Sequence, residues 1–312
     1  MSTNNSPSST ASARPVWLIA GPTASGKSAC ALQLAKALGK QDQTGVIINA
    51  DSMQVYSDIP VLSAAPSKIE LKHCDHRLYG AWDGAETCSA ASWASRAKSE
   101  IDEAHEDGKT PILVGGTGLY LKVLLEGIAP IPEIAPEVRE QVRALETADA
   151  YAALQIEDPL HADVLEPGDS QRIARALEVK RSTGVTLADW QQAKSGGIAE
   201  DITLSPLVLL PERQWIYDRC DARFEQMLEN GAVEEVETLL ARELSTDLPV
   251  MRAIGVPEIA ALIRGELSRE QTVAAGGQAT RQYAKRQFTW LRNQCPAEWK
   301  RIAPGEIAQN LH

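Results

Sequence analysis

The chain has 312 residues, 44% of them hydrophobic and 23% charged, which is enough for about two ordinary domains with a normal core. Its 31 lysines and arginines against 42 aspartates and glutamates leave a formal net charge of −11. This charge excludes a histone-like or polybasic binder of nucleic acid. It does not exclude a local basic groove, because interactions between exposed charges are screened within about 8 Å at physiological salt.

Cysteine usage and the chain ends indicate a soluble protein of the cytoplasm. The five cysteines are Cys30, Cys74, Cys88, Cys220 and Cys295. Their odd number and the absence of a Cys-x-x-Cys pair argue against a disulfide framework or a structural zinc site. Residues 1–14 lack the pattern of a secretory signal and are expected to form a disordered tail, with a second tail at 303–312. No apolar run approaches the ~20 residues of a membrane span, so no membrane partner is expected.

The first half of the chain alternates apolar runs with helical spacing. The runs at 16–20, 46–48 and 112–114 end respectively in a Gly-rich turn, in Asn49-Ala50-Asp51-Ser52 and in Gly115-Gly116-Thr117-Gly118. Near-continuous apolar strands separated by helices predict a parallel sheet covered on both faces, an α/β fold of the P-loop NTPase type. Reactive groups are then expected at the carboxyl ends of these strands.

The sequence changes character after residue 129. Residues 130–199 read as an all-helical insertion, punctuated by prolines and by Gly196-Gly197. Strand character returns at 207–210, followed by a long predicted helix over 213–242 and a last one over 271–292. We therefore predict a discontinuous core, 15–129 with 200–302, around the inserted helical domain.

A phosphate-binding loop is the strongest motif in the chain. The pattern G-x-x-x-x-G-K-[ST], typical of ATP- and other nucleotide-binding sites, lies between a predicted strand and a predicted helix. Its residues are Gly21, Pro22, Thr23, Ala24, Ser25, Gly26, Lys27 and Ser28. The backbone N–H groups of such a loop surround phosphate oxygens, Lys27 adds a positive charge, and the Ser28 hydroxyl is a candidate ligand of Mg²⁺.

These residues leave the reaction open. Asp51 is the one acid at a strand end, and it can act as a general base, as a helix cap or as an outer ligand of Mg²⁺. The first hypothesis is a small-molecule kinase, in which Asp51 activates a hydroxyl. In the second, the loop binds a pyrophosphate ester and carbon is transferred to a nucleophile that Asp51 deprotonates. The third is a nucleotide-binding switch or scaffold without chemistry.

Six ordered blocks resemble the tRNA dimethylallyltransferases, and the resemblance runs from Trp17 to about Arg292. The blocks are the phosphate-binding loop, Asp51-Ser52-Met53-Gln54-Val55-Tyr56, His76-Arg77-Leu78, Gly115-Gly116-Thr117-Gly118-Leu119-Tyr120, Gln171-Arg172-Ile173-Ala174-Arg175-Ala176-Leu177-Glu178 and Thr280-Arg281-Gln282-Tyr283-Ala284-Lys285-Arg286-Gln287. The resemblance implies transfer of a dimethylallyl group from dimethylallyl diphosphate to the exocyclic amine of the adenine 3′ to the anticodon. An adenine-nucleotide isopentenyltransferase is a near alternative, which the helical insertion disfavours because a mononucleotide needs no such clamp.

The resemblance also implies roles for individual residues. Asp51 takes the proton from the amine, Thr117 lies nearby, and the phosphate-binding loop holds the diphosphate with Mg²⁺. Arg223 is placed on the same diphosphate, although a helix-face arginine more often pairs with a neighbouring acid, here Asp221, Glu225 or Glu229.

The implied tRNA-binding residues lie in several blocks. They are Asp51, Ser52, Met53, Gln54, Thr117, Arg139, Gln171, Arg172, Ile173, Ala174, Arg175, Arg252, Gly255, Arg281, Lys285 and Arg286. Arg172 and Arg175 are three residues apart and therefore share one helix face, whereas Ile173 can point to a core. Charge runs are usually solvated faces, so it is the resemblance that assigns them to tRNA. A monomer is expected, and no protein partner is implied.

Two departures from the family pattern concern possible tRNA contacts. Ala65 stands where relatives usually carry a lysine, so a phosphate contact is lost there. Val256 and Pro257 stand where relatives carry a tyrosine followed by a residue other than proline. Valine has no aromatic ring and proline has no backbone N–H, so both groups are lost here. The run His73-Cys74-Asp75-His76 offers metal-ligand chemistry, but four consecutive side chains cannot all converge on one ion, so no metal other than Mg²⁺ is assigned.

Overall fold

The computed structural model describes residues 14–303, so nearly all of the predicted tails, residues 1–13 and 304–312, lie outside the described residues. The chain forms two compact units, Met1–Leu124 with Ile198–His312 and Leu125–Gly197. The second unit begins five residues earlier and ends two residues earlier than the predicted insertion at 130–199. An antiparallel bridge between Ile128 and Ser195 explains the shift, because it joins the two ends of the unit to each other.

The first unit is built on one six-stranded sheet in the order β3-β2-β4-β1-β5-β6, and every pair of neighbours is parallel. The strands are β1 (Pro15–Ala20), β2 (Gly45–Ala50), β3 (Asp75–Arg77), β4 (Thr110–Gly115), β5 (Thr203–Leu209) and β6 (Lys300–Ile302). This sheet confirms the predicted parallel α/β fold. The two edge strands escaped prediction because each has only three residues and is largely polar.

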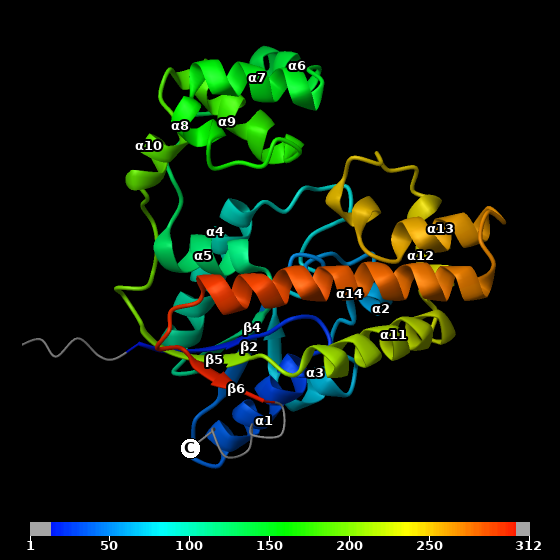
Figure 1. Ribbon diagram of the computed structural model, residues 1–312. Helices are drawn as coiled ribbons and strands as arrows, with labels where there is room; N and C mark the ends of the chain where they lie inside the picture. The colour runs from blue at the N-terminus through cyan, green and yellow to red at the C-terminus, as the bar shows by residue number, and fades with distance from the viewer. Residues whose placement is uncertain (1–13, 304–312) are drawn as a thin grey trace, which may run out of the picture. The chain divides into compact units, whose positions relative to one another are not determined.

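Helices cover both faces of the sheet (Figure 1). On one face, α1 (Lys27–Gly39) packs Ala31 and Leu34 against Ile19, Ile47 and other buried strand residues. On the other face lies α4 (Ala90–Glu106), whose Trp93 is fully buried. The strands carry apolar residues in runs because neither face meets water.

The remaining helices of this unit are α2 (Pro60–Ser63), α3 (Glu70–His73), α5 (Gly118–Glu126), which continues into the second unit, α11 (Arg213–Glu229), α12 (Ala232–Leu240), the 3₁₀ helix η1 (Pro249–Arg252), α13 (Val256–Ile263) and α14 (Arg269–Gln294). The single helix predicted over 213–242 is therefore wrong. The chain breaks at Asn230-Gly231, where Gly231 has a φ of 98°, a left-handed conformation that glycine adopts without strain.

The second unit is a helical bundle with its own core. Its helices are α6 (Pro136–Arg143), α7 (Thr147–Glu157), α8 (Pro159–Ala162), α9 (Ser170–Thr183) and α10 (Leu187–Gln192). Ile173 and Leu177 of α9 pack with Val142 of α6 and Leu154 of α7, and all four are at most 1% exposed. A separate core means that this unit does not depend on the sheet for its hydrophobic packing.

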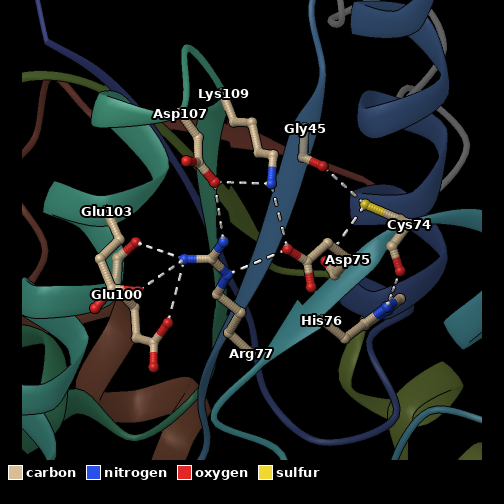
Figure 2. Close-up of polar contacts among 9 residues, drawn as sticks. All are labelled: Gly45, Cys74, Asp75, His76, Arg77, Glu100, Glu103, Asp107 and Lys109. Carbon is tan, nitrogen blue, oxygen red and sulfur yellow. Dashed lines mark hydrogen bonds and ion pairs between the residues drawn. The ribbon is translucent and has the colours of Figure 1, made fainter.

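Ionic contacts hold the edge strand β3 in place (Figure 2). Arg77 lies among four carboxylates: its guanidinium is 3.2 Å from Asp75 and from Glu100, 3.8 Å from Glu103 and 3.9 Å from Asp107. Lys109, just before β4, completes the cluster through Asp107 at 3.0 Å and Asp75 at 3.9 Å. The arginine is only 15% exposed, so this network joins the sheet edge to α4 more firmly than isolated surface pairs do.

The three central strands end at the same level. Ala20 of β1 and Ala50 of β2 both pair with Gly115 of β4. The residues that follow, Gly21, Asp51 and Gly116, are therefore brought together at one edge of the sheet. Across the described residues, no helix is long and apolar enough to cross a membrane.

Candidate functional site

A cavity of about 510 Å³ opens at this edge of the sheet. Several predicted site residues line it, namely Thr23, Lys27, Ser28, Asp51, Ser52, Met53, Gln54, Arg223, Arg252 and Arg286. They come from positions up to 263 residues apart in the chain, and all lie in the first unit. The strand ends, α11, α14 and the loop after α2 together supply the walls.

The phosphate-binding loop has the conformation that its sequence predicts. Ala24 and Gly26 have positive φ angles of 62° and 88°, a left-handed backbone conformation typical of anion-binding nests. The Arg219 side chain of α11 donates to the Ala24 carbonyl at 2.9 Å and so holds the loop from outside. The Ser25 hydroxyl is fully buried and has no hydrogen-bond partner within the described protein. A phosphate oxygen is the kind of acceptor that would satisfy this hydroxyl.

Lys27 is the buried cation of the loop, with 7% of its surface exposed. Burial lowers its pKa to about 8, the carboxylate of Asp51 partly offsets this, and the positive charge of Arg223 adds to the lowering. Its ammonium donates to the Pro22 carbonyl, at 3.4 Å. A lysine with such a pKa gains strongly from an anionic ligand, because the ligand replaces the water that burial removed.

Arg223 of α11 is the second cation of the cavity. Its guanidinium donates to the Ser63 carbonyl at 3.3 Å, whereas the neighbouring acid Asp221 pairs with Arg281 of α14. Burial lowers the pKa of Arg223, and the carboxylate of Asp51 opposes that shift. Arg223 therefore faces the cavity instead of forming the surface ion pair that was its alternative interpretation.

Asp51 is 8% exposed and is held by its own strand end. Its Oδ1 accepts from the Met53 N–H at 3.0 Å, and its backbone N–H donates to the side chain of Asn49 at 2.9 Å. The Asn49 amide in turn donates to the carbonyls of Asp51, at 3.0 Å, and Leu78, at 3.1 Å. A carboxylate has two oxygens, so the bond to Met53 leaves Oδ2 able to accept a proton.

Thr117 joins the end of β4 to the segment after Asp51. Its hydroxyl accepts from the Ser52 N–H at 3.0 Å and donates to the Ser52 hydroxyl at 3.3 Å. Tyr283 of α14 lies at the same place. Burial and the charge of Asp51 raise the pKa of Tyr283 to about 12, while hydrogen bonds with Thr117 and Ser52 and the charge of Arg286 oppose the shift. The phenol therefore stays protonated and able to donate at neutral pH.

Gln54 holds the loop after α2 against the cavity. Its amide donates to the carbonyls of Ser63 and Ala64, at 3.0 and 2.8 Å. On the other side, the Glu235 carboxylate of α12 accepts from the N–H groups of Val61 and Leu62, at 2.7 and 2.9 Å.

Ala65 lies in that loop and lines the cavity, so the position at which the family pattern predicts a lysine faces the site here without a charge.

The other predicted tRNA-binding residues of this unit differ in their surroundings, and among them Arg252 and Arg286 line the cavity. Arg252 is exposed and pairs with Asp247, and Arg281 pairs with Asp221. Lys285 and Arg286 are exposed on α14. Gly255 is buried just before α13.

Pro257 removes no backbone hydrogen bond from that region. It lies in the first turn of α13, where an N–H has no partner within the helix. The N–H that proline lacks would otherwise have been free to meet a phosphate, so the expected loss of an N–H contact stays a prediction, beside the loss of an aromatic ring.

In the helical unit, the predicted tRNA-binding residues divide into exposed and buried ones. Arg139, Gln171, Arg172 and Arg175 are exposed, and Ala174 is partly buried. Ile173 is fully buried in the bundle core, so its predicted part in tRNA binding is wrong for the side chain. Helix periodicity places it opposite the arginines, as Arg172 and Arg175 lie one residue before and two residues after it.

The described residues contain no group of three or more His, Cys, Asp or Glu side chains that could hold a metal by themselves. The run His73-Cys74-Asp75-His76 does not form such a group. Mg²⁺ typically keeps several waters and binds through one or two protein oxygens plus substrate phosphates. The exposed Ser28 hydroxyl and the Asp51 carboxylate, both lining the cavity, fit that pattern of coordination.

Two residues of the site could not be identified from the sequence. Asn49 and Tyr283 were not chosen as site residues, because a buried amide in a strand and a tyrosine in a helix look like core positions. The tyrosine has a weak signal, since its block also carries cations that face the cavity. Asn49 has another: an asparagine in an otherwise apolar strand, two residues before an acid, is costly unless it is hydrogen-bonded.

The fold and the site define a class: an α/β protein with a phosphate-binding loop whose cavity joins a buried lysine and a partly buried arginine to a carboxylate. The model of the IPP transferase family matches residues 54–294. The tRNA dimethylallyltransferase of Erythrobacter litoralis is 62% identical over 92% of this chain and 91% of its own length. That of Zymomonas mobilis is 57% identical over 92% of this chain and 91% of its own.

Solved structures agree with these relatives. The tRNA isopentenylpyrophosphate transferase of Bacillus halodurans has a TM-score of 0.68 at 29% identity and covers 96% of this chain and 94% of its own. A eukaryotic dimethylallyltransferase acting on tRNA has a TM-score of 0.75 at 28% identity, over 89% of this chain and 69% of its own. The chain belongs to the IPP transferase family, as the resemblance predicted, and it is a prenyl-transferring enzyme.

Proposed function

We propose that this enzyme transfers the dimethylallyl group of dimethylallyl diphosphate to the exocyclic N6 amine of the adenosine 3′ to the anticodon in tRNA. The observation that carries the proposal is the meeting of Asp51 with two cations in one cavity, the buried Lys27 and the partly buried Arg223. The site thus offers a proton acceptor beside an anion-binding pocket, as this transfer requires. The names of the relatives support the choice of both substrates.

The cations stabilise the leaving group. As the bond between C1 of the prenyl group and its oxygen breaks, negative charge grows on the diphosphate. Lys27, Arg223, the loop N–H groups and the hydroxyls of Thr23 and Ser25 are suited to receive that charge. Preorganised donors aimed at developing charge contribute about 3 to 4 kcal/mol each in favourable cases.

The carboxylate deprotonates the acceptor amine. As N6 bonds to C1, the amine becomes acidic, and Asp51 accepts its proton. The adenine has to leave its stack to reach a recessed carboxylate. Ser52, Met53, Gln54 and Thr117 lie beside Asp51 and supply the polar and apolar contacts suited to the extruded base.

Mg²⁺ fits beside the loop, where the Ser28 hydroxyl would hold it together with diphosphate oxygens and water. Bound there, it would neutralise part of the diphosphate charge. The protein's own contribution is then the placement of Lys27 and Arg223, which donate to the carbonyls of Pro22 and Ser63.

Each unit offers basic residues for the phosphates of tRNA. In the first unit these are Arg252, Arg281, Lys285 and Arg286; in the helical unit they are Arg139, Arg172 and Arg175. Phosphate contacts orient a nucleic acid without reading its sequence, so the choice of adenosine falls to the residues around Asp51.

The test is incubation with unmodified tRNA, dimethylallyl diphosphate and Mg²⁺, followed by mass analysis of the nucleosides. Isopentenyl adenosine at the position 3′ to the anticodon is the expected product. Free adenine nucleotides and small hydroxylated metabolites with ATP serve as competing substrates in parallel. Prenylation of the nucleotide alone, or phosphate transfer without any isopentenyl adenosine, would overturn the proposal.

A further inference from the structure

Gln287 of α14 connects two loops of the site through its side-chain amide. Its Oε1 accepts from the Thr23 N–H at 2.7 Å, and its Nε2 donates to the Gly116 carbonyl at 3.0 Å. The side chain is 5% exposed. These bonds join residues 264 and 171 positions apart in the chain, so only the packing of α14 on the strand ends brings them together.

The packing around this contact leaves no free space. A side chain at Gly116 would place its Cβ 2.5 Å from the Gln287 Nε2 and 2.5 Å from the Gly21 carbonyl oxygen. Three residues along α14, the ring of Trp290 occupies the space that a side chain at Gly118 would need. Helix α14 is therefore closely fitted to the loop after β4, and a shift of either one must break the amide contacts.

The two loops carry opposite halves of the proposed chemistry. Thr23 lies in the loop that faces the diphosphate, and Gly116 precedes Thr117, whose hydroxyl holds Ser52 beside Asp51. We propose that Gln287 is a positioning residue that sets the spacing between the diphosphate and the acceptor adenine. This inference rests on the proposed function.

The amide is chemically specific for this task. It must accept from an N–H on one side and donate to a carbonyl on the other, which glutamine does and an ionised glutamate cannot. A protonated glutamate has the same shape as glutamine and restores both bonds. Burial raises the pKa of a carboxyl group, so a glutamate at this position should change protonation near neutral pH.

The test is the ratio of kcat between Gln287→Glu and the wild-type enzyme from pH 5.5 to 8.5, with saturating tRNA and dimethylallyl diphosphate. We expect a ratio lower by about 10- to 100-fold at the high end, because small misplacements of reacting groups cost that much, and recovery as pH falls. The ratio cancels the titration of groups common to both enzymes. A purely structural role would lower the melting temperature without making the rate ratio depend on pH.

A second variant separates geometry from added charge. Gln287→Leu keeps the volume but removes both bonds, and we expect its kcat to fall at every pH while KM for tRNA stays within about twofold, since its substitution leaves the exposed cations in place. Gln278→Glu, exposed on the same helix, is the charge-matched control and should behave as wild type. A pH-independent ratio for Gln287→Glu, or wild-type kcat in Gln287→Leu, would overturn the inference. If the wild-type enzyme itself makes no isopentenyl adenosine, the proposed function has failed instead.

Discussion

At the scale of single residues, the site depends on polar groups whose positions are set before any substrate binds. The buried side-chain amide of Asn49 holds Asp51 in place. This amide forms hydrogen bonds with backbone atoms of the strand end and with the carbonyl of Leu78. Trp93 donates to the Asn49 carbonyl at 2.9 Å and closes this network. A carboxylate fixed in this way has little conformational freedom to lose in the transition state, which suits the general-base role proposed for Asp51.

Replacing Asp51 by asparagine should therefore remove the proton acceptor while keeping its shape. We expect kcat to fall by ~10²-fold or more, with the affinity for dimethylallyl diphosphate within a few-fold of wild type. Single-turnover kinetics and equilibrium binding measure the two quantities separately. Asp42→Asn, at an exposed position, is the control. Near-normal turnover in Asp51→Asn would reduce Asp51 to a structural cap of its turn.

Lys27 predicts how substrate binding depends on pH. Its pKa in the free protein is lowered to about 8, so the ammonium loses its proton, and its attraction for diphosphate, as pH rises through that value. The affinity for dimethylallyl diphosphate should be full below pH 8 and weaken above it, by at most about tenfold per pH unit for one proton. Calorimetric titrations from pH 7 to 9.5 would measure this. Lys27→Arg should lack the inflection, because a guanidinium stays charged throughout. A flat profile in the wild-type protein would contradict the assignment.

At the scale of elements, the cavity depends on how α11 crosses α14. Gly276 of α14 lies directly against the ring of Phe224, with no room for a Cβ. Phe224 follows Arg223, and Tyr283 lies two turns beyond Gly276 on the other helix. The close approach of these two helices thus decides where an arginine and a phenol face the cavity.

The variant Gly276→Ala should force the two helices apart. We expect the free energy of unfolding to fall by about 1 to 3 kcal/mol, the usual cost of overpacking, despite the better helix propensity of alanine. Turnover should fall with it, because Arg223 moves with Phe224. Urea unfolding and kcat are the measurements. Gly39→Ala, at the end of α1 with open space around the glycine, should be neutral or slightly stabilising. An unfolding midpoint in Gly276→Ala equal to that of Gly39→Ala would refute this account of the crossing.

At the scale of the whole molecule, a protein with a net charge of −11 has to bind a polyanion through local arrays of cations. In the helical unit, Arg172 lies 3.4 Å from Asp169 and Arg175 lies 3.8 Å from Glu178, with arginine side chains 75% and 44% exposed. The Arg172–Asp169 pair is largely exposed and contributes little to stability. Glu178 is buried, but it also pairs with Arg143 at 3.0 Å and keeps that partner when Arg175 moves. Both arginines can therefore turn to a phosphate at small cost.

Replacing Arg172 and Arg175 together by alanine should weaken tRNA binding and lower the slope of log K against log salt by about 1 to 2, one counterion for each lost phosphate contact. The melting temperature should change little. Binding titrations between about 50 and 300 mM salt measure the slope, because the affinity changes by about tenfold or more over this range. Lys36→Ala with Lys40→Ala removes the same charge from exposed positions in and just after α1 and is the control. Equal slopes for the two double variants would mean that the α9 arginines are only solvated.

Local pattern was enough for much of this protein. The phosphate-binding loop and the central strands could be predicted, because a strand, a glycine turn and a helix N-terminus are each specified by neighbouring residues. The acid at the end of β2 and the arginines of α9 could be located for the same reason, and the family resemblance supplied their chemistry. The short strands β3 and β6 could not, because three residues carry too little pattern and depend on their neighbours in the sheet.

The tertiary structure alone decided what surrounds those residues. That Arg223 turns to the cavity and that Gln287 reaches both Thr23 and Gly116 depend on contacts between distant parts of the chain. Such contacts follow from how helices pack on a finished sheet. A sequence pattern relates only residues that are a few positions apart. The groups that carry the chemistry could therefore be recognised in the sequence, whereas the residues that orient those groups could be identified only in the fold.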